Sequence, residues 1–129
     1  MPHAQTDKIL SWEIYAGGAI PATGAYVGVL VVPMDCEIVS AELLADQAGS
    51  IVVDIWRTTY ADYNPGTHPV VGDSIVAAAP PTLTAAYKSE DSTLTGWTTT
   101  LTEGDLLKIS VTSVDTLTWA RLALRVVPS

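Results

Sequence analysis

Apolar and polar residues alternate with a period of two along most of this chain, whereas the spacing of an amphipathic helix is nearly absent. Near the N-terminus, for example, Leu10, Trp12 and Ile14 alternate with Ser11 and Glu13. Because successive side chains of a strand point to opposite faces, such a segment buries one face and exposes the other. The pattern therefore predicts an all-β fold.

The same alternation predicts further strands, which are separated by turns rich in glycine, proline and aspartate. The expected strands cover about 26–32, 39–43, 50–58, 107–112 and 119–126, and the expected turns lie at 33–35, 46–49, 102–105 and 113–116. In the last two strands the inward side chains are expected to be Leu107, Ile109, Val111, Leu122, Leu124 and Val126.

A long connection, residues 59–93, separates the two groups of strands. Within it we predict a short helix near residues 84–90, with Thr84 as its N-cap. Short strands joined by tight turns and one long loop crossover are typical of an antiparallel two-sheet sandwich, jelly-roll-like in type. We expect a polar N-terminal arm at residues 1–8, followed by a single β-sandwich domain at residues 9–129.

Composition narrows the classes of partner. Hydrophobic residues make up 48% of the 129 residues, yet no stretch approaches the roughly 20 apolar residues of a membrane helix, so no membrane insertion is expected. An apolar excess in a small domain favours burial in a homo-oligomer, although the many alanines are an alternative explanation. The net charge of −8 repels phosphate backbones, which argues against nucleic-acid binding.

The residues that carry chemistry are few and scattered. His3 and His68 share no metal-binding spacing, and Cys36, the single cysteine, is expected to be a small core residue. Neither a nucleophile elbow nor a glycine-rich phosphate loop is present. The sequence therefore predicts no catalytic residues, no metal, no cofactor and no enzymatic activity.

Two acidic positions are candidates for a site. Glu90 and Asp91 are sequence neighbours, so on an extended chain their side chains point to opposite sides and do not form a facing pair. Asp54 lies between Val52 and Trp56 on one strand face. We expect Asp54 to be exposed or in an interface, and the alternative is a buried carboxylate with a polar partner.

The aromatic residues are four tryptophans and five tyrosines, with no phenylalanine. Rings with a polar group suit half-wet surfaces such as subunit contacts and sugar sites. Trp119, Arg121 and Arg125 fall opposite the expected core face of the last strand, so they form the candidate interface or glycan-contact surface. The other tryptophans, at positions 12, 56 and 97, are expected to pack in the core or on the sheet.

Several short motifs occur in a fixed order between about residues 32 and 127: Asp54-Ile55-Trp56, a proline-rich loop, Leu94-Thr95-Gly96-Trp97, and Gly104-Asp105 before a strand. This order resembles a small β module of virion proteins of tailed bacteriophages, chiefly tail fibres, tailspikes and head-associated proteins. The resemblance implies a jelly-roll-like module that assembles as a homo-oligomer, usually a trimer, on the virion surface, without catalytic residues.

Such modules often occur within long fibre chains, whereas this chain holds little beyond the module. That difference favours a capsid decoration (cement) protein or a head-fibre protein, assembled in the host cytoplasm, whose N-terminal arm anchors it to a capsid or tail protein of the same virion. The alternative is a carbohydrate- or receptor-binding tail-fibre module, with a host surface glycan as its ligand.

Overall fold

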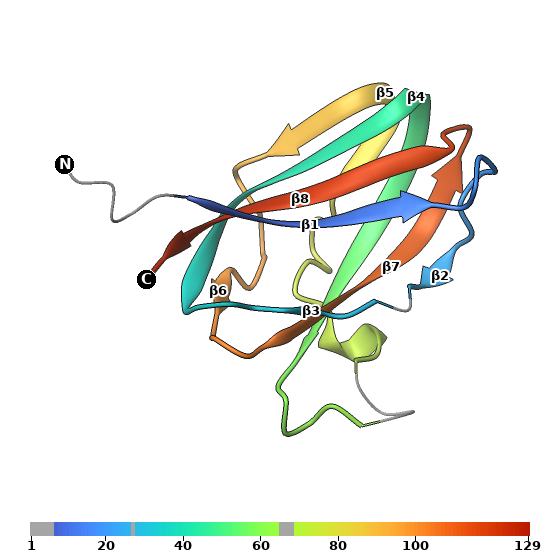
Figure 1. Ribbon diagram of the computed structural model, residues 1–129. Helices are drawn as coiled ribbons and strands as arrows, with labels where there is room; N and C mark the ends of the chain where they lie inside the picture. Colours follow the sequence, from blue (N-terminus) through green and yellow to red (C-terminus); the bar gives the residue numbers. More distant parts are fainter. Residues whose placement is uncertain (1–6, 27, 65–68) are drawn as a thin grey trace.

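The computed structural model describes residues 7–26, 28–64 and 69–129, and these form an antiparallel β structure (Figure 1). The all-β prediction is therefore confirmed, and no α-helix occurs among the described residues. In chain order the elements are β1 (Lys8–Tyr15), β2 (Gly24–Ala25), β3 (Leu30–Val31), β4 (Cys36–Thr58), the 3-10 helix η1 (Val71–Asp73), β5 (Thr82–Asp91), β6 (Thr100–Leu101), β7 (Leu106–Asp115) and β8 (Trp119–Pro128).

The long strand β4 organises the sheet. Its first part pairs with β8 as far as Ala45↔Ala120, and its second part pairs with β7 from Ser50↔Asp115 onward. Five residues separate these two pairs along β4, and five separate them along the segment that joins β7 to β8. The register on the two sides of the bend in β4 is therefore the same. As a result β7 and β8 lie end to end along one edge of β4 instead of pairing with each other.

A bend in β4 turns this single sheet into two layers (Figure 1). One layer holds β1, β8 and the first half of β4, and the other holds β7 with β2, β3 and the second half of β4. Strand β5 follows the opposite edge of β4 through the same bend, from Ala41↔Asp91 to Val52↔Thr82. Strands that pass from one layer to the other are a known way to close the corner of a β-sandwich.

The core fills the space between the two layers. All six aliphatic residues expected to face inward from the last two strands are buried, which confirms the alternation in this part of the chain. Fully burying a leucine or isoleucine side chain contributes roughly 1.5–3 kcal/mol. The largest fully buried side chains are Ile14, Ile38, Leu43, Ile51, Ile55, Leu83, Leu101, Leu107, Ile109, Leu117, Leu122 and Leu124.

Cys36 belongs to this core, as predicted, and its thiol is buried at the start of β4. Burial raises the pKa of the thiol, and the carboxylates of Asp35 and Asp105 raise it further. The thiol therefore stays protonated at neutral pH, and a protonated buried thiol is unreactive.

At the corner, β4 stays continuous while its partner is interrupted. Thr116 adopts a φ of 73°, and Leu117 N donates a hydrogen bond to Asp115 O at 2.9 Å. This tight turn places the fully buried Leu117 directly against Gly49 of β4. A Cβ atom at Gly49 would lie 2.8 Å from Leu117 Cβ and 2.9 Å from Asp115 O, so only glycine fits here without a shift.

The motifs that carry the phage resemblance have structural contacts in this fold. Trp97 Nε1 donates to Ala79 O at 2.7 Å, which fastens the segment before β5 to the turn that contains Gly96. The carboxylate of Asp54 accepts hydrogen bonds from Ser74 Oγ, from Trp56 Nε1 and from the amide of residue 55. Asp54 is half-buried and partnered, so the alternative interpretation describes it better than the exposed one.

Two of the predicted elements are wrong. The helix near 84–90 is absent, because residues 82–91 form β5 and pair with β4 along most of that length. Ala85 has a φ of 45°, which is incompatible with an α-helix, and its amide donates to Ser50 Oγ at 2.9 Å. The turn expected at 46–49 is also absent, because these residues form the bend inside β4.

Three other boundaries differ. The strand expected at 26–32 is reduced to Leu30–Val31, although Tyr26 N and Val32 N still hydrogen-bond to the chain around β7, and Val27 lies outside the described residues. The turn expected at 113–116 begins later, because β7 extends to Asp115. The arm expected at 1–8 lies outside the described residues up to residue 6, and Lys8 already belongs to β1.

We expect Gly49→Ala to lower the free energy of unfolding by about 1–3 kcal/mol, the usual cost of overpacking, because the added methyl group meets Leu117 and the Asp115 carbonyl. Gly72→Ala is the matched control, since a Cβ atom added at Gly72 would have no neighbour within 4 Å. Urea unfolding should leave the control within about 1 kcal/mol of wild type. Equal stability of the two variants would contradict the close packing at the corner.

Candidate functional site

The predicted surface lies on the outward face of β8. Trp119, Arg121 and Arg125 alternate with buried residues along that strand, so the prediction that they face away from the core is confirmed. Trp119 is half-buried, and both arginines are exposed. The structure brings Trp119 and Arg121 together, whereas Arg125 lies farther along the strand, opposite Ile9 of β1.

These three side chains form hydrogen bonds or ion pairs with acidic residues of β1 and of the segment before it. Glu13 of β1 accepts a hydrogen bond from Trp119 Nε1 at 3.1 Å and forms an ion pair with Arg121 at 3.5 Å. The Cζ atom of Arg121 lies 5.7 Å from the centre of the Trp119 ring, which is within the range of a cation–π contact. Arg125 pairs with Asp7 at 3.7 Å. Exposed ion pairs contribute little to stability, so their main effect is to neutralise the arginines locally.

Asp46 positions the backbone of Trp119. Its Oδ1 accepts hydrogen bonds from the amides of Thr118 at 3.0 Å and of Trp119 at 3.1 Å, and its Oδ2 accepts a short one from the Thr118 hydroxyl. The hydrogen bond from the Thr118 hydroxyl is the main reason why the pKa of Asp46 is lowered, and the backbone amides act in the same direction. Asp46 thus ties the start of β8 to the bend of β4.

The polar groups of the Trp119 surface therefore already have interaction partners within the same chain. Its indole N–H already has an acceptor, and the Arg121 guanidinium lies over the ring. A sugar ring that stacked on the same side of Trp119 would have to displace Arg121. The sequence could not identify Glu13 and Asp46 as partners, because both contacts depend on how β1, β4 and β8 are arranged.

A second surface, which the sequence analysis missed, lies at the end of the molecule where β4 leaves the sheet. It is a shallow depression of about 480 Å³, and we call its lining residues the tyrosine patch: Val29, Val31, Tyr60, Tyr63, Gly104 and Leu106. Tyr60 is 82% exposed and Val31 is 60% exposed, which is unusual for side chains of this size. The pair Tyr60 and Tyr63 in a connecting loop was the only signal in the sequence.

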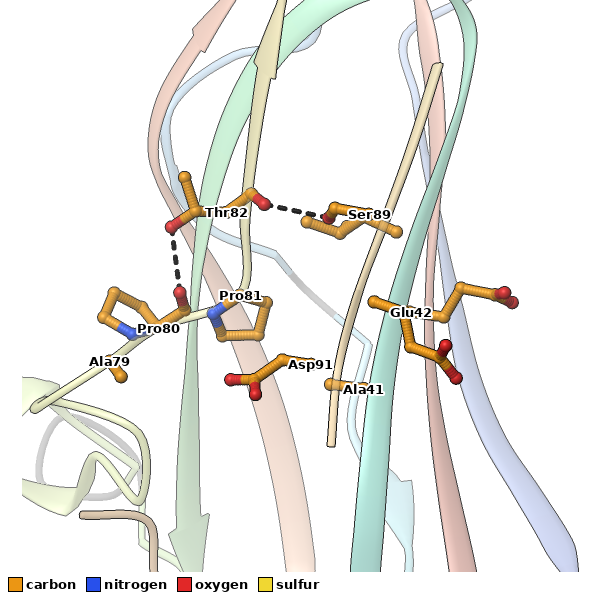
Figure 2. Close-up of a pocket in the computed structure, with 10 residues that line it drawn as sticks. Ala41, Glu42, Ala79, Pro80, Pro81, Thr82, Ser89 and Asp91 are labelled. Carbon is orange, nitrogen blue, oxygen red and sulfur yellow. Dashed lines mark hydrogen bonds between the residues drawn. The ribbon is translucent and has the colours of Figure 1, made fainter. Parts of the chain in front are cut away.

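A third feature is a cleft of about 160 Å³ between the two arms of β5, which are its beginning near Thr82 and its end at residues 89–91 (Figure 2). Ser89 Oγ donates to Thr82 O at 2.9 Å, which holds the arms together. Asp91 shares the inward face with Ala41, whereas Glu90 lies opposite Glu42, so the neighbouring carboxylates point to opposite sides, as the sequence analysis expected. The Asp91 carboxylate already accepts the amides of residues 93 and 94, which leaves it a structural cap.

Within residues 7–26, 28–64 and 69–129 no group of three or more His, Cys, Asp or Glu side chains is placed to hold a metal ion. Both histidines, His3 and His68, lie outside the described residues. The expected absence of metal, cofactor and catalysis stays a prediction. No helix in the described part of the chain has the length and hydrophobicity needed to cross a membrane.

The hydrogen bonds of Asp46 should make its contribution to stability depend on pH. Because the pKa is lowered in the folded protein, the contribution is present above the unfolded-state pKa, about 3.9, and is lost as the pH falls through the folded-state pKa. We expect Asp46→Asn to be less stable than wild type at pH 7 and to approach it below about pH 4. The measurement is urea unfolding as a function of pH.

Asp62→Asn is the control for this comparison, because Asp62 is an exposed aspartate in the loop after β4. Its difference from wild type should stay small throughout the pH range. A stability difference for Asp46→Asn that persists unchanged into strong acid would rule out the carboxylate as its source.

Comparison of the chain with protein-family models, with curated proteins and with solved structures gave no match.

Proposed function

We propose that this protein is a non-catalytic assembly subunit, and specifically a capsid decoration, cement or head-fibre protein of a tailed bacteriophage that works as a homo-oligomer on the virion surface. The observation that supports the assembly role is the tyrosine patch. The phage assignment rests on the resemblance of the sequence motifs.

The composition of the tyrosine patch suits a contact between proteins. Tyrosine gives a large contact area at a low entropic cost, and aromatic residues are enriched in the buried centre of interfaces. The two tyrosines stand beside the exposed Val31 and the buried Leu106, so apolar surface is continuous between loop and sheet. Leaving such a surface in water is unfavourable, which is why exposed apolar patches mark interaction sites.

We infer that the patch is covered by sibling chains. The resemblance implies a trimer, in which three copies of the patch would meet around one axis. An oligomer of this kind would stabilise a capsid by lying over the joints between capsid subunits, and the folded sheet would act as a rigid support. This role needs complementary surfaces and no reacting groups.

Binding of a host glycan is the second candidate. Its support is the Trp119 surface, where an aromatic ring stands among charged side chains that hydrogen-bond well to sugars. Glycan binding ranks below the assembly role because of the contacts that the Trp119 ring already makes. Arg121 and Glu13 already occupy it, whereas the tyrosine patch is open.

We expect wild-type protein to sediment as an oligomer, and we expect the double variant Tyr60→Ala with Tyr63→Ala to sediment as a smaller species. Each removed tyrosine should weaken association by roughly 1–2 kcal/mol, as for residues in the centre of an interface. Sedimentation equilibrium over a wide range of concentrations measures both effects.

Tyr87→Ala is the matched control, because Tyr87 is 59% exposed on β5 and lies outside the patch. It should leave the mass of the oligomer unchanged. A wild-type protein that is monomeric at all concentrations would contradict the proposed function, and equal effects of the patch and control variants would contradict the role of the patch.

A further inference from the structure

Among the described residues, strand β1 forms an unpaired edge of the sheet. It follows β8 at one end of the strand order, and its register with β8 runs from Lys8 to Tyr15 without a bulge. Proteins commonly protect such an edge with charged side chains, a proline or a bulge. Strand β1 has no proline or bulge, and the side chains in the middle of its inward face are Leu10, Trp12 and Ile14. Its charged residues are Lys8, at the first position, and Glu13, whose carboxylate already pairs with Arg121 of the same chain.

The exposed side chains of β1 are arranged symmetrically. Ile9 is 54% exposed and Tyr15 is 59% exposed, and both lie on the outward face at equal distances in sequence from Trp12. Trp12 is half-buried, and its Nε1 is the one buried side-chain polar atom without a hydrogen-bond partner among the described residues. A buried donor without an acceptor is destabilising, but a second tryptophan is also only a donor, so this atom does not itself favour a partner.

We propose that two copies of this chain associate through their β1 strands, which pair antiparallel around a two-fold axis that passes between the two Trp12 residues. The axis stands perpendicular to the sheet, so the layer continues from one copy into the other with its core face on the same side. Ile9 of each copy then lies opposite Tyr15 of the other, a pairing of β-branched and aromatic residues that is favourable across strands.

Charge and burial select this register over its neighbours. A pairing centred on Ser11 would set the exposed Ile9 against Glu13, and one centred on Leu10 would set Asp7 against Glu13. A pairing centred on Glu13 would place two glutamates opposite each other, and like charges in that position are destabilising. Of the registers centred on residues 10, 11, 12 and 13, only the one centred on Trp12 matches apolar residues with apolar residues on both faces of β1.

This edge contact deepens the proposed assembly role, on which it rests, but it uses a surface different from the tyrosine patch. A two-fold contact at β1 and a three-fold contact at the patch are compatible, because many closed assemblies combine both kinds of axis. The two contacts can therefore be tested separately.

The test introduces opposite charges at positions 9 and 15 of β1. The variants are made in a background protein that also carries Tyr60→Ala and Tyr63→Ala, so that β1 pairing is the contact that remains between copies. That background should sediment as a dimer. Either Ile9→Lys or Tyr15→Glu should weaken the dimer roughly 2- to 30-fold, because each removes two cross-strand pairs of about 0.2–1 kcal/mol per dimer. The two changes combined should restore association, because each lysine then faces a glutamate of the other copy.

Restoration of this kind identifies the register. Positions 9 and 15 of one strand are roughly 20 Å apart, too far to form an ion pair within a chain. Ile20→Lys is the control, because Ile20 is 51% exposed and lies outside β1, and it should leave the dimer unchanged. A background variant that is monomeric while wild type is larger would overturn the edge contact and leave the proposed function standing.

Hydrogen exchange on the same background protein, without any change in β1, gives a second readout that does not depend on the folding of the β1 variants. Amides of β1 should exchange more slowly at high protein concentration than at low concentration, and amides of the short strand β6 should not change. Exchange in β1 that is independent of concentration would overturn the edge contact.

Discussion

The fold depends on one continuous strand, β4, which pairs antiparallel with β8 in one layer and with β7 in the other. The register next to the bend is the same against β8, as far as Ala45↔Ala120, and against β7, from Ser50↔Asp115 onward. It shifts by one residue farther from the bend on each side, between Ile38 and Ser40 and between Val52 and Val53. The turn is possible because Gly49 lets the buried Leu117 approach the backbone, and because Asp46 accepts the amides at the start of β8. Both layers of the core are therefore built on one strand, β4.

This construction explains why the distinctive motifs of the sequence have structural roles. The carboxylate of Asp54 and the indole of Trp97 hold the long connection against the sheet, and Asp46 and Asp91 bind backbone amides. Exposed large apolar side chains include Val31, Tyr60 and Tyr63 of the tyrosine patch, and Ile9 and Tyr15 of β1. Surfaces of this kind, on a support held by many strand pairs, agree with the proposed assembly role.

The sequence predicted best where the decisive interactions are local to a strand. The alternation placed the aliphatic residues of β7 and β8 inward and placed Trp119, Arg121 and Arg125 outward, because side-chain direction follows directly from an extended backbone. It failed at 84–90, where alanine, lysine and glutamate favour a helix but pairing with β4 imposes a strand. The prediction of a turn at 46–49 also failed, because aspartate and glycine are typical both of turns and of a sharp bend within a strand. The tyrosine patch and the acidic partners of Trp119 could not be predicted, because they combine segments far apart in sequence.

Native-state hydrogen exchange of β4 tests the central claim most directly. If β4 carries both layers, amides in its first and second halves should open together, with a free energy close to that of global unfolding and the same dependence on denaturant. If one half of β4 opens at low denaturant while the other stays protected, the two layers are separate units and β4 does not organise the fold.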